Sequence, residues 1–106
     1  MSIATQFQVG TVTVTGASNV RITNVNAAVS GTEYSLALVN GLKRIVIRSR
    51  LLATTQFTFT SGQSGTTYIT VPPGCTFDEG GIELSGTTLY LQTSANSNTV
   101  EILEFY

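Results

Sequence analysis

Hydrophobic and polar residues alternate along most of the chain, and this two-residue period is typical of β-strands with one buried face. The alternation is clearest where Tyr34, Leu36 and Leu38 are separated by smaller residues, which predicts a strand over 34–39. Asn40-Gly41 follows directly, and this dipeptide suits a type I′ turn because both of its residues must take positive φ. We therefore expect a hairpin between 34–39 and the next alternating segment, 43–50.

The returning segment 43–50 would have two chemically different faces. Successive side chains of a strand point to opposite sides, so one side carries Ile45 and Ile47 and the other carries Arg44, Val46, Arg48 and Arg50. A third strand over 55–60 would place Phe57 and Phe59 on one side. Three adjacent strands with a common buried face are about the minimum for an independently stable sheet.

Shorter alternating segments, separated by turn residues, predict further strands elsewhere in the chain. In order they are 2–15 (at least its second half), 20–25, 66–71, 75–77, 82–84, 88–93 and 100–106. In 20–25 we expect Val20 and Ile22 to be buried and Arg21 to point outward. Asp78-Glu79-Gly80-Gly81 reads as a turn, and the apolar end VEILEFY reads as a docked strand. Residues 1–18 are either a first strand, an arm that pairs with another subunit, or a frayed terminus.

Short strands at regular spacing, with no helical period, predict an all-β fold. We expect an antiparallel β-sandwich that is jelly-roll-like, has about eight short strands, and forms a single domain over residues 1–106. An immunoglobulin-like topology also fits the spacing, but the Cys…Trp…Cys signature of true immunoglobulin domains is absent because the chain has no Trp and one Cys.

Composition removes several classes of function. Only 10% of the residues are charged, against roughly 25% in an ordinary domain, and Thr, Ser, Asn, Gln and Gly replace them. A neutral surface suits a chain that is partly covered by neighbours. The net charge of −1 gives no general attraction to nucleic acid or anionic membranes. The first residues lack the basic start and apolar core of a secretory signal, and the uncharged stretch 51–77 is too polar for a membrane span.

The residues present favour no catalytic or metal site, and we expect no cofactor. There is no His to act as a base or a metal ligand, and Cys75, the single Cys, is best read as a small buried thiol. Asp78, Glu79 and Glu83 could serve a hydrolase or hold Ca²⁺, but they lack the alternating pattern of a calcium loop. A solvated turn is the favoured interpretation, and we expect the protein not to be an enzyme.

The sharpest polar feature is the row of three arginines on one strand face. These arginines could form a solvated face, pair with carboxylates of the last strand, or bind an acidic partner, and Arg favours the last two roles. Exposed tyrosines could stack on sugar rings or anchor a protein interface. The candidate interface residues are Arg44, Arg48, Arg50, Glu101, Glu104, Tyr68 and Tyr90.

From Lys43 onward the chain resembles the small virion proteins of tailed bacteriophages. The resemblance rests on KRIVIRSR, FTFTSGQSGTTYITVPPGCTF, IELSGTTLYLQTS and the closing TVEILEFY. It implies a structural virion protein, such as a head decoration or cement protein that stabilises the capsid lattice. It also implies a homo-oligomer, commonly a trimer, made in the host cytoplasm and located on the head surface. The partner would be the major capsid protein or another virion protein. The alternative is a carbohydrate-binding β-sandwich, for which Tyr68, Tyr90 and Tyr106 are candidates.

Overall fold

The computed structural model describes residues 19–106, and within that range the chain forms eight strands and no helix. The sequence-based prediction of an all-β chain is confirmed. The predicted strand or arm at residues 1–18 lies outside the described residues. In chain order the strands are β1 (Val20–Ala27), β2 (Tyr34–Ala37), β3 (Leu42–Ser49), β4 (Thr55–Thr58), β5 (Ile69–Val71), β6 (Thr76–Leu84), β7 (Thr88–Thr93) and β8 (Asn98–Phe105).

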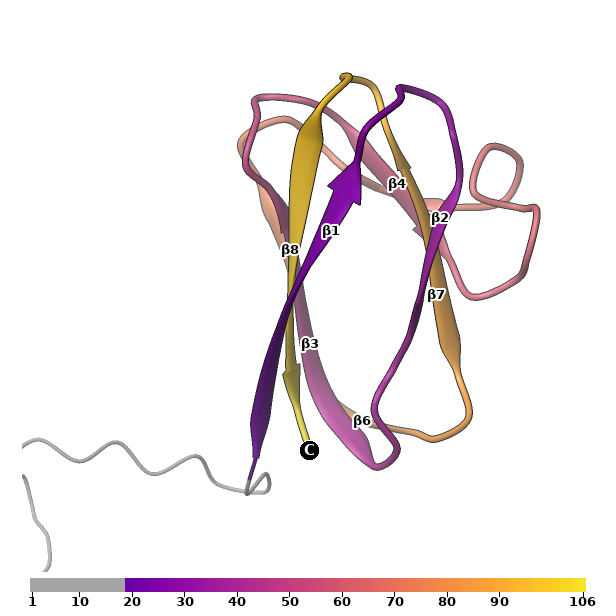
Figure 1. The fold of residues 1–106 in the computed structure, drawn as a ribbon. Helices are drawn as coiled ribbons and strands as arrows, with labels where there is room; N and C mark the ends of the chain where they lie inside the picture. The colour runs from indigo at the N-terminus through magenta and orange to yellow at the C-terminus, as the bar shows by residue number, and fades with distance from the viewer. Residues whose placement is uncertain (1–18) are drawn as a thin grey trace, which may run out of the picture.

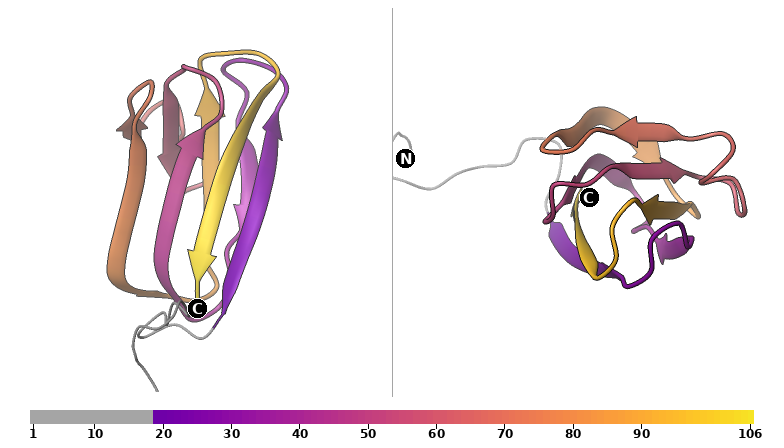
Figure 2. Two further views of the ribbon diagram at one scale, coloured as in Figure 1. Left: turned by 90° about the vertical axis from the view of Figure 1, so that its left-hand side faces the viewer. Right: turned by 90° about the horizontal axis from the view of Figure 1, so that it is seen from above.

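The strands form two four-stranded antiparallel sheets that pack as a sandwich (Figure 1). One sheet has the order β1-β8-β3-β6, and its outer face is turned toward the viewer in the left panel of Figure 2. The other has the order β2-β7-β4-β5. Every charged residue of the chain except Glu33 and Arg50 lies on a strand of the first sheet. We therefore call β1-β8-β3-β6 the charged sheet and β2-β7-β4-β5 the neutral sheet.

Connections in this fold run between the sheets, and this makes the predicted hairpin wrong. Apart from the link between β4 and β5, each connection joins a strand of one sheet to a strand of the other. β2 therefore pairs with β7, while β3 pairs with β8 and β6. Gly41 has a φ of 73°, but Asn40 keeps a negative φ, so the turn is not type I′. Leu38 and Leu42 on either side of it are both buried in the core, which draws the chain across the end of the sandwich.

The core lies between the inner faces of the two sheets. The charged sheet contributes Ile45, Ile47, Val100 and Ile102, which confirms the predicted orientation of the 43–50 strand. The neutral sheet contributes Leu89, Leu91, Val71 and Phe57, and the Phe57 ring packs against that of Phe77 with centroids 4.9 Å apart. β8 lies between β1 and β3, so the prediction that the C-terminal segment is a docked strand is confirmed.

The predicted orientation of β1 is wrong. Val20 and Ile22 are exposed, whereas Arg21, Thr23 and Val25 take the inward positions. The reason is an ion pair: Arg21 Nε donates to Glu104 Oε1 at 2.7 Å, and Glu104 is fully buried on the inner face of β8. A buried carboxylate requires hydrogen-bond donors, so the arginine determines which face of β1 points inward.

The predicted turn at Asp78–Gly81 is also wrong, because β6 continues through it. The register with β3 shifts between Leu42 and Arg44 in a bulge-like irregularity where β6 has two extra residues, and Gly81 there has a φ of 70°. A glycine tolerates that backbone conformation without the steric cost of a Cβ.

Two smaller differences from the predicted strands concern where β4 and β5 begin and end. β5 is only three residues long, and Phe59 lies beyond the end of β4 and is exposed instead of sharing the buried face of Phe57.

Candidate protein-binding surface

The outer face of the charged sheet presents its side chains in three rows that run across the strands. The register places Ile22, Leu103, Val46 and Asp78 in one row. The next row holds Val20, Phe105, Arg44 and Gly80, and the row on the other side holds Asn24, Glu101, Arg48 and Thr76. The middle row is apolar except for Asp78 at its β6 end, the row with Arg44 adds Val20 and Phe105, and the row on the other side is polar.

The charges on this face are paired with one another. Arg44 donates to both carboxylate oxygens of Asp78, at 2.9 Å from Nε and 2.6 Å from the terminal nitrogen. Arg48 and Arg50 share Glu101, donating to Oε1 at 2.6 Å and to Oε2 at 2.7 Å. These hydrogen bonds favour the ionised form of each carboxyl group. Arg44 accordingly lowers the pKa of Asp78 below its ordinary value, and Arg50 and Arg48 lower that of Glu101.

Between the ion pairs lies an apolar strip made of Val20, Ile22, Leu103, Val46 and Phe105. Ile22 is 72% exposed and Val20 is 48% exposed, while the other three residues are half-buried. Arg44 lies over the Phe105 ring, 4.9 Å from its centroid, and so links the strip to the charged rows. Single exposed apolar residues are normal on protein surfaces, but a contiguous strip with a polar rim marks a contact site.

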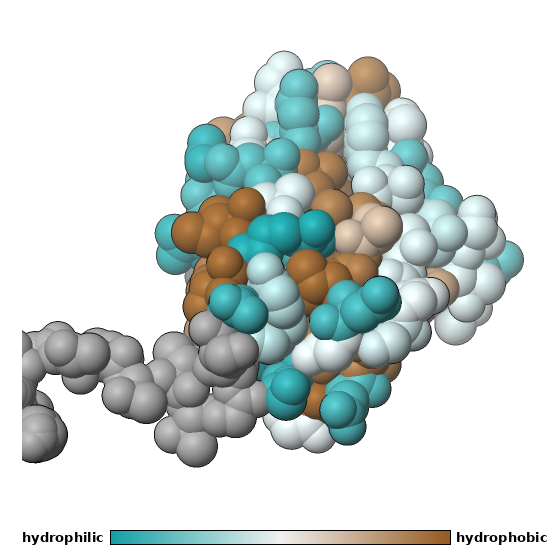
Figure 3. Space-filling model, turned by 60° about the horizontal axis from the view of Figure 1, so that its bottom comes forward, coloured by the Kyte–Doolittle hydropathy of each residue, from teal (hydrophilic) through white to brown (hydrophobic). Residues whose placement is uncertain are grey.

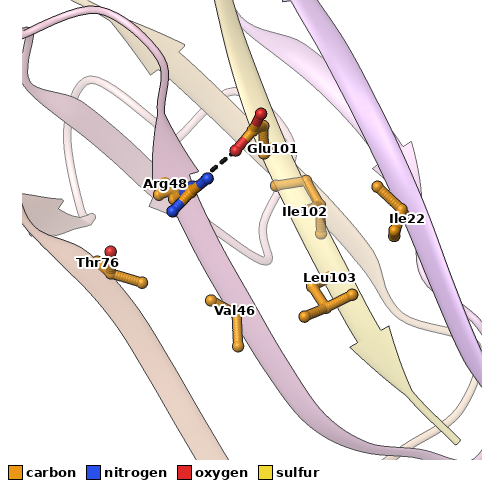
Figure 4. A pocket seen from close by; sticks show the side chains of 7 residues that line it. All are labelled: Ile22, Val46, Arg48, Thr76, Glu101, Ile102 and Leu103. Carbon is orange, nitrogen blue, oxygen red and sulfur yellow. Dashed lines mark hydrogen bonds and ion pairs between the residues drawn. The ribbon is translucent and has the colours of Figure 1, made fainter.

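A shallow open hollow of about 420 Å³ crosses this face. Figure 4 shows it, with Ile22, Leu103 and Val46 from three neighbouring strands and the Arg48–Glu101 ion pair at one end. A side chain of a partner could enter the hollow, but its walls are too open to enclose a small molecule. On the face shown in Figure 3, apolar groups likewise lie among hydrophilic ones and form no single large patch.

The structure separates the predicted interface residues into three places. Arg44, Arg48, Arg50 and Glu101 do lie together on the outer face of the charged sheet. Glu104 does not join them, because even-numbered residues of β8 point into the sandwich. Its Oε2 accepts the backbone N–H of Val39 at 2.9 Å, and Arg21 donates both to Glu104 and to the Ala37 carbonyl at 2.9 Å. This pair therefore ties the charged sheet to the chain that follows β2.

Tyr90 and Tyr68 lie elsewhere. Tyr90 is half-buried on the outer face of the neutral sheet, between Ser35 of β2 and Thr58 of β4. The next row of that face pairs Gln92 with Gln56. Tyr68 is exposed in the loop before β5 and does not contribute to either sheet face. Thr58 lies beside Tyr90 and also lines a hollow with Tyr68, so the two tyrosines lie on either side of Thr58.

Chemistry-bearing side chains do not gather elsewhere in the described part of the chain. Residues 19–106 contain no group of three or more Cys, Asp or Glu side chains placed to hold a metal ion. Cys75 is exposed, so its predicted burial is wrong: it follows the Pro-Pro-Gly turn at the rim of the sandwich. Across the same residues no helix is long and apolar enough to cross a membrane.

Sequence reasoning missed the apolar half of the candidate surface. The alternation predicts that Ile22 and Val20 are buried, and it indicates only that Leu103 and Phe105 belong to an apolar C-terminal strand. The spacing of two glutamates in the last strand nevertheless contained a usable signal for which face points inward. Glu101 and Glu104 are three positions apart, so they must lie on opposite faces of one strand, and one of them had to point into the sandwich.

Comparison with known proteins informs only the fold. No family model and no curated protein sequence matches the chain. Among solved structures the chain is similar to one described as "Solution NMR structure of a de novo designed double-stranded beta-helix", with a TM-score of 0.51 and 16% sequence identity. The match covers 84% of this chain and 100% of that chain. It supports a two-sheet all-β architecture.

Proposed function

We propose that this chain is a structural virion protein of a tailed bacteriophage that binds the head as a decoration or cement protein. It would act by contacts with protein neighbours and not by catalysis. The resemblance of residues 43–106 to small virion proteins supplies the biological setting. The observation that carries the mode of action is the outer face of the charged sheet, where an apolar strip is bordered by ion pairs. An apolar centre with a polar rim is the usual anatomy of a protein–protein interface.

The proposed mechanism is linkage between binding and assembly. A protein that binds the assembled shell and not its free subunits shifts the equilibrium toward the shell, by an amount set by its concentration relative to Kd. The partner is then the major capsid protein or another head protein, and the site of action is the head surface. A jelly-roll topology is part of the same proposal, supported by the strand orders β1-β8-β3-β6 and β2-β7-β4-β5 with their inter-sheet connections.

Co-sedimentation tests the proposal directly. The purified full chain is mixed with decoration-free heads of the phage that encodes it and centrifuged, with an unrelated β-sandwich of similar mass as the control. We expect saturable recovery of the chain with the heads and greater resistance of the heads to heat. A chain that stays in the supernatant, and that mass spectrometry does not detect in mature particles, would overturn the proposal.

A carbohydrate-binding function is a second candidate, favoured by the outer face of the neutral sheet. Tyr90 presents a planar ring there beside the neighbouring side-chain amides of Gln56 and Gln92, and no strand of this sheet has a charge. Aromatic rings and amides are groups that bind neutral sugars. A glycan array should then give signals that Tyr90→Ala abolishes and Tyr68→Ala retains. An array without signal, or equal binding by both variants, would rule this function out.

A further inference from the structure

The two central strands of the charged sheet carry complementary side chains at each outward position. Across the β8–β3 pairing, Glu101 lies beside Arg48, Leu103 beside Val46, and Phe105 beside Arg44. Each outward position of β8 is thus matched on β3 by a residue that it can contact favourably. The pairs are an acid with a base, two aliphatic side chains, and an aromatic ring with a guanidinium.

We propose that a second copy of this chain docks on this face. The two copies are related by a two-fold axis that lies between the two facing sheets, runs parallel to the strands, and passes midway between β8 and β3. A half-turn about that line exchanges β8 with β3 while keeping each residue at its height along the strands. It therefore places Glu101 opposite the partner's Arg48, Leu103 opposite the partner's Val46, and Phe105 opposite the partner's Arg44. This inference rests on the premise of the proposed function that the face binds protein, and it makes a second copy the neighbour on this face, so that the pair would contact the head through its other surfaces.

The alternative two-fold axis, across the strands, is disfavoured by charge. A half-turn about an axis that lies over the Leu103–Val46 row would set each strand opposite its own copy. The row above that axis would then face the partner's row below it. Arg44 would then face the partner's Arg48, which places like charges together in both halves of the interface. Like-charge contacts across an interface cost several kcal/mol, so the sequence of these two strands selects the axis along them.

The match is best at the centre of the sheet and relaxes toward its edges. Stacked β-sheets cross at about 30° because each sheet is twisted, so strands far from the axis diverge from their counterparts. On β1 and β6 the facing rows would bring Val20 over the partner's Gly80, which has no side chain to obstruct it. They would also bring Asn24 over the partner's Thr76 and Ile22 over the partner's Asp78, an apolar side chain against a carboxylate that its own Arg44 already pairs. Association would cover Ile22 and Val20, the most exposed apolar residues of the strip.

Charge-reversal variants test both the contact and its symmetry. The wild-type chain should have twice the 11.2 kDa mass of one copy by light scattering after size exclusion. Glu101→Arg and Arg48→Glu should each weaken self-association by at least about 100-fold, because each creates two like-charge contacts per pair. Mixing the two variants in equal amounts should restore the double mass, since each new charge then faces its opposite. Ser35→Arg, at an exposed position of the neutral sheet, is the matched control and should keep the wild-type mass.

Three results would overturn the inference: a wild-type chain that is monomeric or trimeric, charge-reversed variants that remain paired, or a mixture that stays monomeric. Thermal unfolding monitored by circular dichroism shows whether each variant is folded, and the mixing result stands on its own if one variant is less stable. The co-sedimentation experiment fails independently. A chain that pairs but does not bind heads would refute the virion function and leave the two-fold contact intact.

Discussion

Arg21 and Glu104 form a part-buried ion pair on the inner side of the charged sheet, with Nε and Oε1 2.7 Å apart. The side chain of Glu104 is 0% exposed, and that of Arg21 is 37% exposed. Glu104 also accepts the backbone N–H of Val39, which leads from the neutral sheet into β3. One carboxylate thus satisfies donors from two separate parts of the sandwich and fixes how they meet.

Replacing that carboxylate should strongly destabilise the fold. Glu104→Ala leaves the Arg21 guanidinium and the Val39 N–H without their acceptor, and this should cost about 2 kcal/mol because water can solvate only part of the guanidinium. Urea unfolding monitored by circular dichroism would measure the loss. Glu83→Ala, an exposed carboxylate on β6, is the control and should change the free energy of unfolding by less than about 0.5 kcal/mol. Similar losses for both variants would contradict the role assigned to Glu104.

A buried hydroxyl in the neutral sheet offers a stabilising substitution. Thr55 and Thr93 lie side by side in the β4–β7 pairing and are both buried, but only Thr93 has a partner: its Oγ1 donates to the Ala95 carbonyl at 2.9 Å. Thr55 Oγ1 makes no hydrogen bond within the described residues. Thr55→Val should therefore raise the free energy of unfolding by about 1 kcal/mol, whereas Thr93→Val should lower it by a similar amount.

The same unfolding assay would compare these two variants, which have the same change in shape. The expected result is that the two variants change the free energy of unfolding in opposite directions. A loss of stability in Thr55→Val equal to that in Thr93→Val would show that the Thr55 hydroxyl does have a partner in solution.

The bulge in β6 predicts different effects for two adjacent glycines. Gly81 has a φ of 70°, so Gly81→Ala should cost about 1–2 kcal/mol through backbone strain alone, because an added Cβ would meet no atom within 4 Å. A Cβ at Gly80 would meet Arg44 side-chain carbons at 3.8 Å, which is ordinary contact. Gly80→Ala should therefore be nearly neutral. Thermal unfolding of both variants checks this, and equal effects would contradict the bulge geometry.

Three carboxylates predict a loss of stability in acid. The pKa of Glu33 is lowered by hydrogen bonds from Ser64 and from the Gly62 and Ser64 N–H groups, and those of Asp78 and Glu101 are lowered by their arginines. A carboxyl group with a lowered pKa stabilises the folded state above its unfolded value, near 4. That contribution is lost as the pH falls through the folded-state pKa.

Denaturation midpoints measured from pH 6 down to pH 2 should therefore be constant at first and then fall below about pH 4.5. Glu101→Gln should show a shallower fall than the wild-type chain, because it removes one of the three groups. If the denaturation midpoint of that variant falls as steeply in acid as that of the wild-type chain, Glu101 does not contribute to the acid sensitivity.

The alternation of residues predicted the strands well because it depends on local geometry alone. Ile45 and Ile47 point inward and Arg44 and Arg48 outward, as the two-residue period requires. Pairing partners could not be obtained in this way. Asn40-Gly41 has the local chemistry of a hairpin turn, yet the burial of Leu38 and Leu42 sends the chain to the other sheet. At this turn the burial of apolar side chains in a core formed by residues distant in sequence outweighs the local preference for a hairpin.

The candidate site was half predictable for the same reason. The arginine row follows from alternation within one strand, and Glu101 is its natural partner on the last strand. The apolar strip does not follow, because Ile22 would be buried in any scheme that counts hydrophobicity. Its exposure depends on Arg21 reaching a carboxylate 83 positions away, a contact that only the folded chain reveals.

The lack of charged residues on the neutral sheet has a consequence for how contacts through its outer face respond to salt. Its outer face bears hydroxyls, amides and an aromatic ring, with no carboxylate, ammonium or guanidinium on any of its strands. Attraction between ions weakens as salt accumulates around them, but a surface without ions has nothing to screen. Contacts made through this face should keep their strength in fresh water and in brine alike.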